Sequence, residues 1–264
     1  MSLHPTAVID SSAKIDSSVT IGPYSVIGPN VEIGADTWIG PHVVINGPTK
    51  IGKENQIFQF SSIGEVPQDK KFHGENSLLE IGDGNTIREF VTINRGTEDG
   101  GGITRVGDDN WLMAYIHIAH DCIVGSHTIF ANCATLAGHV VIQDYAILGG
   151  STLVHQFCTV GKHAFCGMGS AISKDVPPFV MVGGNPSEPH GLNREGIKRH
   201  GFSKEVRENL DEAYKLTYNS GLKAKEAAEK IAELAQSTPE LAPFVELINT
   251  STRGIIRPKT NKHK

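Results

Sequence analysis

Histidines concentrate in one stretch of the chain, where they could serve acid–base chemistry. Four of the twelve histidines are His117, His120, His139 and His155, and two successive steps of 18 residues connect His120, Gly138 and Gln156. An imidazole has an ordinary pKa of about 6.5, so it can accept a proton near neutral pH. A glycine leaves its backbone N–H unobstructed, and such a donor can stabilise an oxyanion. A base beside such a donor predicts transfer of an acyl group to a hydroxyl or an amine.

The step of 18 residues matters because aliphatic side chains recur at every sixth position. The pattern runs from Leu3 to Ile63, returns from Ile81 to Ile93, and continues from Val106 to Ile172. Helices repeat every 3.6 residues and strands every 2, so neither explains it. If each hexapeptide is a short strand and a bend, three of them make one triangular coil, and residues 18 apart stack on consecutive coils. The sequence therefore predicts an all-β solenoid, a parallel β-helix.

The hexapeptide pattern is interrupted twice. Asp69 and Glu75 occupy positions that should be apolar, and unpaired carboxylates are costly inside a narrow core, so a loop is expected near residues 65–77. Thirteen residues separate Ile93 from Val106, and the glycines between them predict a second loop near residues 95–104. Insertions of this kind commonly carry binding residues.

The pattern ends near residue 176, and a different architecture follows. A Pro- and Gly-rich connector leads to helical signals, so we expect a solenoid over residues 1–188 and an α-helical domain over residues 189–264. Helices are predicted from Ser203 to Asn219, from Lys223 to Gln236, and from Thr238 onward. Residues 258–264 are expected to be disordered.

Charge and composition limit the partners. Residues 189–264 contain 14 Lys and Arg against 10 Asp and Glu, whereas residues 1–188 contain 10 against 19. A basic helical domain favours an anionic protein or a phosphorylated ligand, and no nucleic-acid partner is expected. With no long apolar run and no signal peptide, a cytoplasmic protein without a membrane span is expected. Cys122, Cys158 and Cys166 fall on inward positions and should be reduced core residues.

Five longer strings point to a known family. In order they are "SSIGEVPQDKKF", "HIAHDCIVG", "ATLAGHV", "VHQFC" and "GLNREGIKRHGF". They resemble the UDP-N-acetylglucosamine 3-O-acyltransferases, hexapeptide-repeat acyltransferases that open lipid A biosynthesis. The resemblance covers nearly the whole chain. It implies a left-handed β-helix, a handedness that the period alone does not supply, followed by a C-terminal helical domain.

The resemblance also assigns roles to residues. It implies that His120 is the general base that removes the proton from the sugar 3-hydroxyl, which attacks the thioester of a 3-hydroxyacyl-acyl carrier protein without a covalent enzyme intermediate. Gly138 would supply the oxyanion donor. Other implied site residues are His117, His139, His155 and Gln156 around the base, Asp69 and Lys71 on the glucosamine, and Asn193, Glu195 and Arg199 toward the nucleotide.

Further expectations concern the assembly and individual residues. Its members are trimers with active sites between the prisms, so a homotrimer is expected here, with the acidic carrier protein docking on the basic helical domain. Met168 stands at the floor of the acyl groove, which favours a medium-length acyl chain. Asp121 could orient His120, although neighbouring strand residues point to opposite faces. His200 stands where an arginine is common in relatives. The phosphate contact of that arginine is therefore not carried over to His200.

Three other functions fit parts of the sequence. The γ-type carbonic anhydrases use the same solenoid with three histidines on zinc, and His117, His120 and His139 could be such a set. That interpretation gives no role to the first loop or to "GLNREGIKRHGF", so no metal or cofactor is expected. An N-acyltransferase later in the same pathway would carry an extra N-terminal domain. A purely structural solenoid would leave the histidines without a function.

Overall fold

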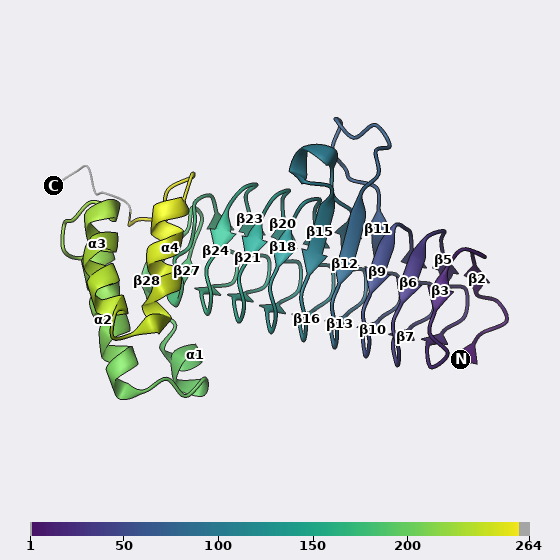
Figure 1. Cartoon of the computed structure of the whole chain (residues 1–264), viewed down its shortest axis with the longest axis horizontal. Coiled ribbons are helices and arrows are strands. Elements are labelled where there is room, and N and C mark those ends of the chain that lie inside the picture. The colour runs from purple at the N-terminus through teal and green to yellow at the C-terminus, as the bar shows by residue number, and fades with distance from the viewer. Residues whose placement is uncertain (1, 259–264) are drawn as a thin grey trace.

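The chain folds into a parallel β-helix followed by helices, as the computed structural model of residues 2–258 shows (Figure 1). The expected disorder of residues 258–264 falls, except for Pro258, outside the described residues. Sheet A contains β1 (Ser2–Leu3), β4 (Thr20–Ile21), β7 (Trp38–Ile39), β10 (Gln56–Ile57), β13 (Thr86–Ile87), β16 (Trp111–Leu112), β19 (Ile129–Phe130), β22 (Ile147–Leu148), β25 (Phe165–Cys166), β27 (Val180–Gly183) and β28 (Glu188–Leu192).

The two other sheets complete the prism. Sheet B contains β2 (Val8–Ile9), β5 (Val26–Ile27), β8 (Val44–Ile45), β11 (Ser62–Glu65), β14 (Thr92–Asn94), β17 (His117–Ile118), β20 (Thr135–Leu136), β23 (Leu153–Val154) and β26 (Ala171–Ile172). Sheet C contains β3 (Lys14–Ile15), β6 (Val31–Ile33), β9 (Thr49–Ile51), β12 (Leu78–Ile81), β15 (Ile103–Val106), β18 (Ile123–Val124), β21 (Val141–Ile142) and β24 (Thr159–Val160).

The repeating aliphatic residue is the inward side chain of nearly every strand. In sheet A, Ile57 pairs with Ile39 on one side and Ile87 on the other, and all three are fully buried. Burying such a side chain contributes about 1.5–3 kcal/mol, so each coil is held by the coils above and below it. The predicted β-helix is confirmed. Cys122, Cys158 and Cys166 are buried as predicted, while Cys133 is exposed.

Three corners separate the sheets, and we name them A–B, B–C and C–A. The chain turns at each corner with one residue in the left-handed region, such as Tyr115 at A–B, Asp121 at B–C and His127 at C–A. Residues other than glycine adopt this conformation only where the surroundings support it. Residues at the same position of successive corners therefore form three columns along the prism.

Both insertions leave the same corner. The first lies between β11 and β12 and the second between β14 and β15, so each joins a strand of sheet B to one of sheet C. The second insertion contains the 3₁₀ helix η1 (Glu98–Gly100), which Thr97 caps. Figure 1 shows both excursions projecting from one edge of the solenoid. The next corner along this edge carries His120.

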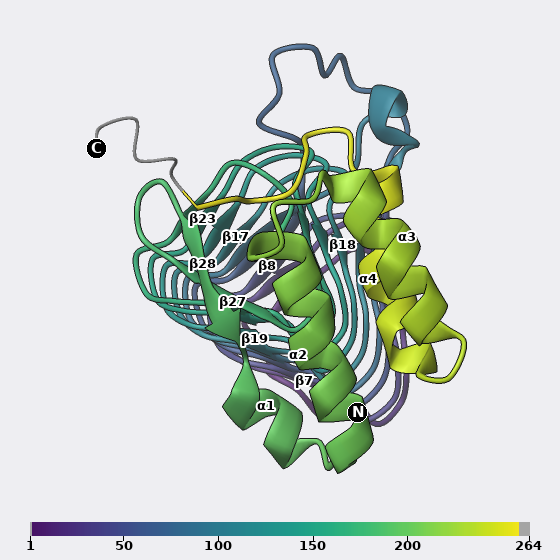
Figure 2. The same cartoon turned by 90° about the vertical axis from the view of Figure 1, so that its left-hand side faces the viewer.

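The C-terminal region covers the end of the solenoid (Figure 2). Its elements are α1 (Arg194–Arg199), α2 (Lys204–Tyr218), α3 (Ala224–Ala235), η2 (Pro239–Leu241) and α4 (Ala242–Thr250). The three expected helices are present, and Ser203 caps α2 as predicted. Helix α1 was not expected because six residues are too few for a helical pattern. The β27–β28 hairpin extends sheet A within the Pro- and Gly-rich connector. Within the described residues no helix is both long and apolar enough to cross a membrane.

Candidate active site

The B–C corner stacks His120, Gly138 and Gln156 on three consecutive coils. The preceding strands pair in register, with His117 opposite Thr135 and Thr135 opposite Leu153. Backbone hydrogen bonds continue the alignment through the corner, since the His139 N–H donates to the His120 carbonyl at 3.0 Å. The step of 18 residues in the sequence is therefore one coil of the structure.

Asp121 fixes the orientation and tautomer of His120. The His120 Nδ1 atom lies 2.7 Å from Asp121 Oδ2, and the Asp121 side chain is 1% exposed. An ionised carboxylate can only accept, so Nδ1 carries the hydrogen and Nε2 keeps a free lone pair. The alternation of strand residues does not apply, because both residues belong to the turn after β17 and Asp121 has φ +61°. The left-handed turn brings the two side chains together.

Asp121 is held in turn by the second insertion. Its Oδ1 accepts the Thr97 N–H at 2.7 Å, and its Oδ2 accepts the Thr97 hydroxyl at 2.7 Å. The Asp121 N–H donates to the Thr104 hydroxyl at 2.8 Å. A buried carboxylate needs such partners to remain charged. No motif or spacing pointed to Thr97, because it lies 24 residues from its partner.

Gly138 lies directly beneath the His120 ring, where no other residue fits. A Cβ atom added to Gly138 would lie 2.6 Å from His120 Cε1 and 2.8 Å from Nε2. Within the part of the chain that the structure describes, the Gly138 N–H makes no hydrogen bond. An unused backbone donor therefore lies beside the free nitrogen of the base, as oxyanion stabilisation requires.

The other histidines surround His120 at different depths. His117 contacts the Thr92 hydroxyl through Nδ1 at 2.7 Å, and burial, together with the nearby His120, lowers the pKa of His117. The His139 ring meets the His120 ring edge-on at 5.2 Å and stacks on Phe157 at 4.5 Å. His155 is exposed, and its Nδ1 donates to the Gln156 carbonyl at 3.1 Å.

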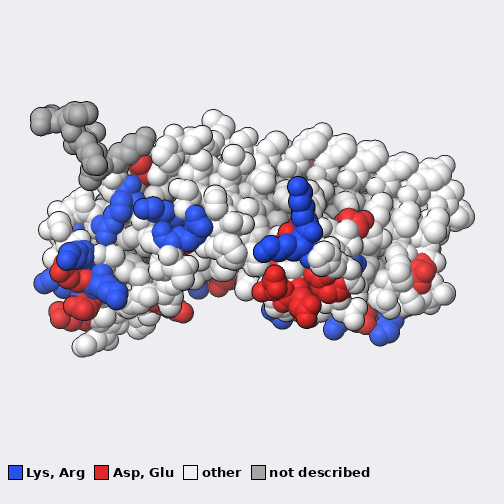
Figure 3. Space-filling model, turned by 90° about the horizontal axis from the view of Figure 1, so that it is seen from above, with Lys and Arg blue, Asp and Glu red and all other residues white. Residues whose placement is uncertain are grey.

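Asp69 and Lys71 lie in a cavity of about 620 Å³ between the two insertions. The remaining lining residues are His73, Gly74, Glu75, Thr97, Glu98 and Asp99. Figure 3, from the insertion side, shows acidic and basic side chains gathered over this part of the solenoid. The cavity offers donors and acceptors of the kind that bind a sugar. Thr97, which lines this cavity, also donates its hydroxyl to the Asp121 carboxylate.

The residues expected at the nucleotide lie on another corner. Asn193 caps α1, and its Nδ2 donates at 3.0 Å to the carbonyl of His163 at the C–A corner. Glu195 and Arg199 are exposed on α1. The insertions project at the top of both Figure 1 and Figure 2 and α1 lies at the bottom. One chain therefore does not bring this group together with His120.

His200 and Met168 occupy further positions. The His200 ring contacts Tyr145 and His163 edge-on, at 4.8 and 4.7 Å, so it belongs to an aromatic cluster on the C–A corner. Met168 is 85% exposed in the turn between β25 and β26, which is the A–B corner. It lies across sheet B from His120.

The side-chain nitrogen and oxygen atoms of His120, Asp121 and His139 lie within 4.8 Å of one another, as at a metal site. His117, which the zinc alternative would need, is outside this group and contacts Thr92. Asp121 Oδ2 already accepts from Thr97 and His120. The three-histidine set of the zinc alternative is therefore not assembled in one chain.

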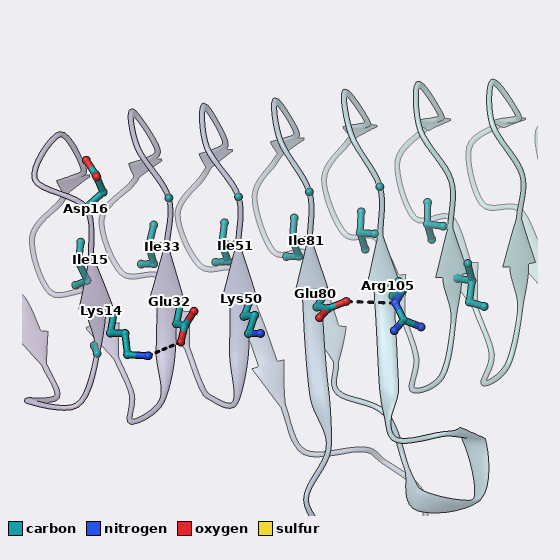
Figure 4. Close-up of a pocket in the computed structure, with 18 residues that line it drawn as sticks. Lys14, Ile15, Asp16, Glu32, Ile33, Lys50, Ile51, Glu80, Ile81 and Arg105 are labelled. Carbon is teal, nitrogen blue, oxygen red and sulfur yellow. Dashed lines mark hydrogen bonds and ion pairs between the residues drawn. The ribbon is translucent and has the colours of Figure 1, made fainter.

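A wider groove of about 1050 Å³ crosses sheet C (Figure 4). Its floor carries a row of alternating charges, Lys14, Glu32, Lys50, Glu80 and Arg105. Lys14 pairs with Glu32 at 2.8 Å, and Arg105 pairs with Glu80 at 3.2 Å. Exposed ion pairs of this kind contribute little to stability, and their side chains remain solvated. None of the site histidines lines this groove.

Comparison with known proteins agrees with the architecture. A model of the bacterial transferase hexapeptide (six repeats) matches residues 103–138 of the β-helix. The model for domain 2 of UDP-N-acetylglucosamine O-acyltransferase matches residues 175–256.

Full-length relatives give the family. An acyl-(acyl-carrier-protein)–UDP-N-acetylglucosamine O-acyltransferase of Halorhodospira halophila is 53% identical over 97% of this chain and 99% of its own. The crystal structure of a UDP-N-acetylglucosamine O-acyltransferase from Moraxella catarrhalis has 48% identity and a TM-score of 0.95, covering 97% of this chain and 100% of that one. The Francisella novicida UDP-N-acetylglucosamine acyltransferase has 48% identity and a TM-score of 0.96, covering 98% and 95%. The chain belongs to the UDP-N-acetylglucosamine O-acyltransferase family.

A pH-dependent stability is predicted from His163. Burial, followed by His200 and Lys162, lowers its pKa from 6.5 to about 4. The folded state therefore favours the neutral ring, and stability is lost as pH falls from 6.5 toward 4, by up to roughly 3 kcal/mol. When urea unfolding is measured at decreasing pH, the free energy of unfolding of the wild type should fall more steeply than that of His163→Phe. Equal slopes would contradict this assignment.

Proposed function

We propose that the chain transfers a 3-hydroxyacyl group from acyl carrier protein to the 3-hydroxyl of UDP-N-acetylglucosamine, the first step of lipid A biosynthesis. The observation that carries this proposal is one edge on which Asp121 holds His120 with Nε2 free, directly above the unused N–H of Gly138. The printed names of the relatives supply the donor and acceptor classes.

The reaction needs one base and one oxyanion donor. His120 Nε2 takes the proton of the sugar hydroxyl while its oxygen bonds to the thioester carbon. The thioester oxygen becomes negative and accepts from the Gly138 N–H. Collapse of this intermediate breaks the carbon–sulfur bond, and the leaving thiolate takes the proton from His120. Asp121 stabilises the transient imidazolium. No covalent enzyme intermediate is required.

The sugar fits the cavity between the insertions. Asp69 and Lys71 offer an acceptor and a donor there, next to the segment that supports Asp121. His117, His139, His155 and Gln156 shape the corner around the base. Arg199 and Glu195 on α1 are then expected at the nucleotide, with Arg199 suited to a diphosphate. Asn193 contributes by capping α1, since both ends of its amide have partners in the chain.

A second copy must complete this site, which supports a homotrimer. Because His120 and α1 lie on different corners, the B–C corner of one copy must approach the C–A corner of another to bind one nucleotide sugar. Three copies can satisfy this around a threefold axis in two ways. Either the A–B corners or the faces of sheet C point at the axis.

Surface chemistry favours the A–B corner. Tyr24, Phe60, Phe90 and Tyr115 are 42–60% exposed there, and together with His42 they form one stack with ring centroids 4.8–5.4 Å apart. An exposed apolar edge of this length is typical of an interface. Sheet C would instead bring identical charges together at the axis. With A–B corners central, sheet B of one copy faces sheet A of the next.

The helical region is the proposed docking surface for the carrier protein. Arg194, Lys198, Lys204 and Arg207 line a cavity of about 370 Å³ between α1 and α2, together with Glu195, Glu208 and Asp211. Figure 3 shows further basic side chains over the helical end. An acidic carrier protein would be steered there. Free cysteines throughout agree with the reducing cytoplasm as the proposed location.

The first prediction tests the base by mass spectrometry of product formed from UDP-N-acetylglucosamine and 3-hydroxyacyl carrier protein. His120→Ala should lower turnover by about 10²–10⁴, because general base catalysis contributes that much. Its thermal unfolding and nucleotide binding should stay near wild type, since the His120 ring is at the edge of the core. More than half of wild-type activity in the variant would refute the assignment.

The second prediction tests the assembly. Cys133 is exposed on the A–B corner, whereas the other cysteines are buried. A short bismaleimide should therefore link copies through Cys133, and Cys133→Ser should abolish the link. In the Cys133→Ser background, Lys50→Cys on sheet C should not cross-link. An active monomer in sedimentation, or cross-linking through position 50 alone, would contradict the arrangement.

The third prediction concerns chain length. An acyl chain that starts at His120 and runs along sheet B toward the A–B corner reaches Met168. Each methylene without room loses about 0.8 kcal/mol of burial, so Met168 should favour a 3-hydroxydecanoyl over a 3-hydroxymyristoyl donor. Met168→Gly should shift preference toward the longer chain in the same product assay. Identical chain-length profiles for wild type and Met168→Gly would disprove this role.

A further inference from the structure

We infer that Thr97 is a positioning residue for the general base, acting through Asp121. The inference rests on the proposed role of His120. Thr97 is 4% exposed, and it donates both its N–H and its hydroxyl to the Asp121 carboxylate, each at 2.7 Å. The hydroxyl shares Oδ2 with His120 Nδ1, so one oxygen connects the insertion to the catalytic ring.

The insertion is not needed to form this corner. On the next two coils the B–C corner contains no inserted segment. The chain turns there through a single residue in the left-handed region, His139 on one coil and Phe157 on the other. These corners stack normally on the one that carries His120. The extra residues between β14 and β15 therefore serve something other than the turn of the β-helix. What they contact is the carboxylate of Asp121.

The insertion also packs tightly on that carboxylate. A Cβ atom added to Gly100 would lie 2.0 Å from Asp121 Cγ, so η1 lies directly against it. Thr97 and Gly100 thus exclude water from Asp121, whose Oδ2 lies 2.7 Å from His120 Nδ1 and 3.8 Å from His139 Nε2. A dry, fully bonded carboxylate holds the imidazole in one orientation and stabilises its protonated form.

The same segment lines the sugar cavity. Thr97, Glu98 and Asp99 lie along it with Asp69 and Lys71. The backbone of one short stretch therefore contacts the sugar cavity on one side and the support of the base on the other. Loss of the Thr97 hydroxyl should impair orientation of the base, whereas loosening of η1 should impair sugar binding. The two effects are separable as kcat and KM.

The test compares Thr97→Val with Thr97→Ser. Val keeps the shape and the N–H but removes the hydroxyl, which also accepts the Gly100 N–H as the cap of η1. We expect kcat to fall roughly tenfold, as for a lost hydrogen bond to a charged group, and KM for UDP-N-acetylglucosamine to rise by less than that factor because the cap is lost. Ser keeps the hydroxyl and should retain nearly wild-type kcat. Thr37→Val is the matched control, because Thr37 is 1% exposed and donates its hydroxyl to the Gly52 carbonyl at the C–A corner. It should affect stability alone.

A pH profile provides a second measurement. Without the Thr97 hydroxyl, the charge on Asp121 Oδ2 interacts more strongly with the protonated His120 ring. The ring then stays protonated to a higher pH, so the acid limb of kcat/KM should move to higher pH. The titratable groups around His120 are Asp121 on its own turn, His117 on β17 and His139 on the next coil, with Glu98 and Asp99 on η1 at the cavity. All remain in the variant, so the shift reports the hydroxyl.

Gly100→Ala keeps every hydrogen-bonding group but should displace η1 from Asp121. It should give the same fall in kcat and the same shift of the acid limb, together with a raised KM for UDP-N-acetylglucosamine, because η1 also lines the sugar cavity. It keeps the inference testable if Thr97→Val does not fold. Wild-type kcat and an unshifted profile in Thr97→Val or Gly100→Ala, with His120→Ala inactive, would overturn the inference and leave the proposed function standing. Substantial activity in His120→Ala would instead overturn the proposed function.

Discussion

The close packing of one aliphatic side chain per hexapeptide is the constraint on which the rest of this structure depends. Ile39, Ile57 and Ile87 show it in sheet A, where each is fully buried between its neighbours in register. A slip of one residue would turn the inward side chain outward, so the register is strongly specified. Because the register is fixed on every coil, the corners align, and a residue at a corner lies above the residue 18 places later.

This alignment builds a rigid catalytic edge from turns. His120 stacks over Gly138, which leaves space for the ring only because it has no Cβ atom. Two insertions leave the same corner, and one returns to hold Asp121 through Thr97. Geometry on a β-helix is precise because each turn is supported by the turns beside it. In the proposed function the insertions bind the sugar, and the solenoid tolerates such insertions at its edges.

The corners also divide the functions of the molecule. One corner carries the base, another carries α1, and the third carries an exposed aromatic stack. An isolated prism cannot bring the first two together, because the core between them is filled with buried side chains. The proposed association of identical copies would resolve this separation and cover the apolar edge at the same time. In that arrangement the charged face of sheet C would remain in water.

The sequence by itself determined the period, the β-helix and the stacking of His120, Gly138 and Gln156, because a repeat that buries one side chain in six has one packing solution. It also indicated both insertions, the first because Asp69 and Glu75 cannot replace core residues and the second because thirteen residues separate Ile93 from Val106. The tertiary structure decided what depends on turn geometry and on long-range contacts. Asp121 reaches His120 through a left-handed turn that strand alternation does not describe, and Thr97 reaches Asp121 from 24 residues away. His120 and α1 are likewise separated because they lie at different corners of the prism. The hexapeptide pattern assigns residues of the β-helix to corners, but it does not say at which corner a helix packs.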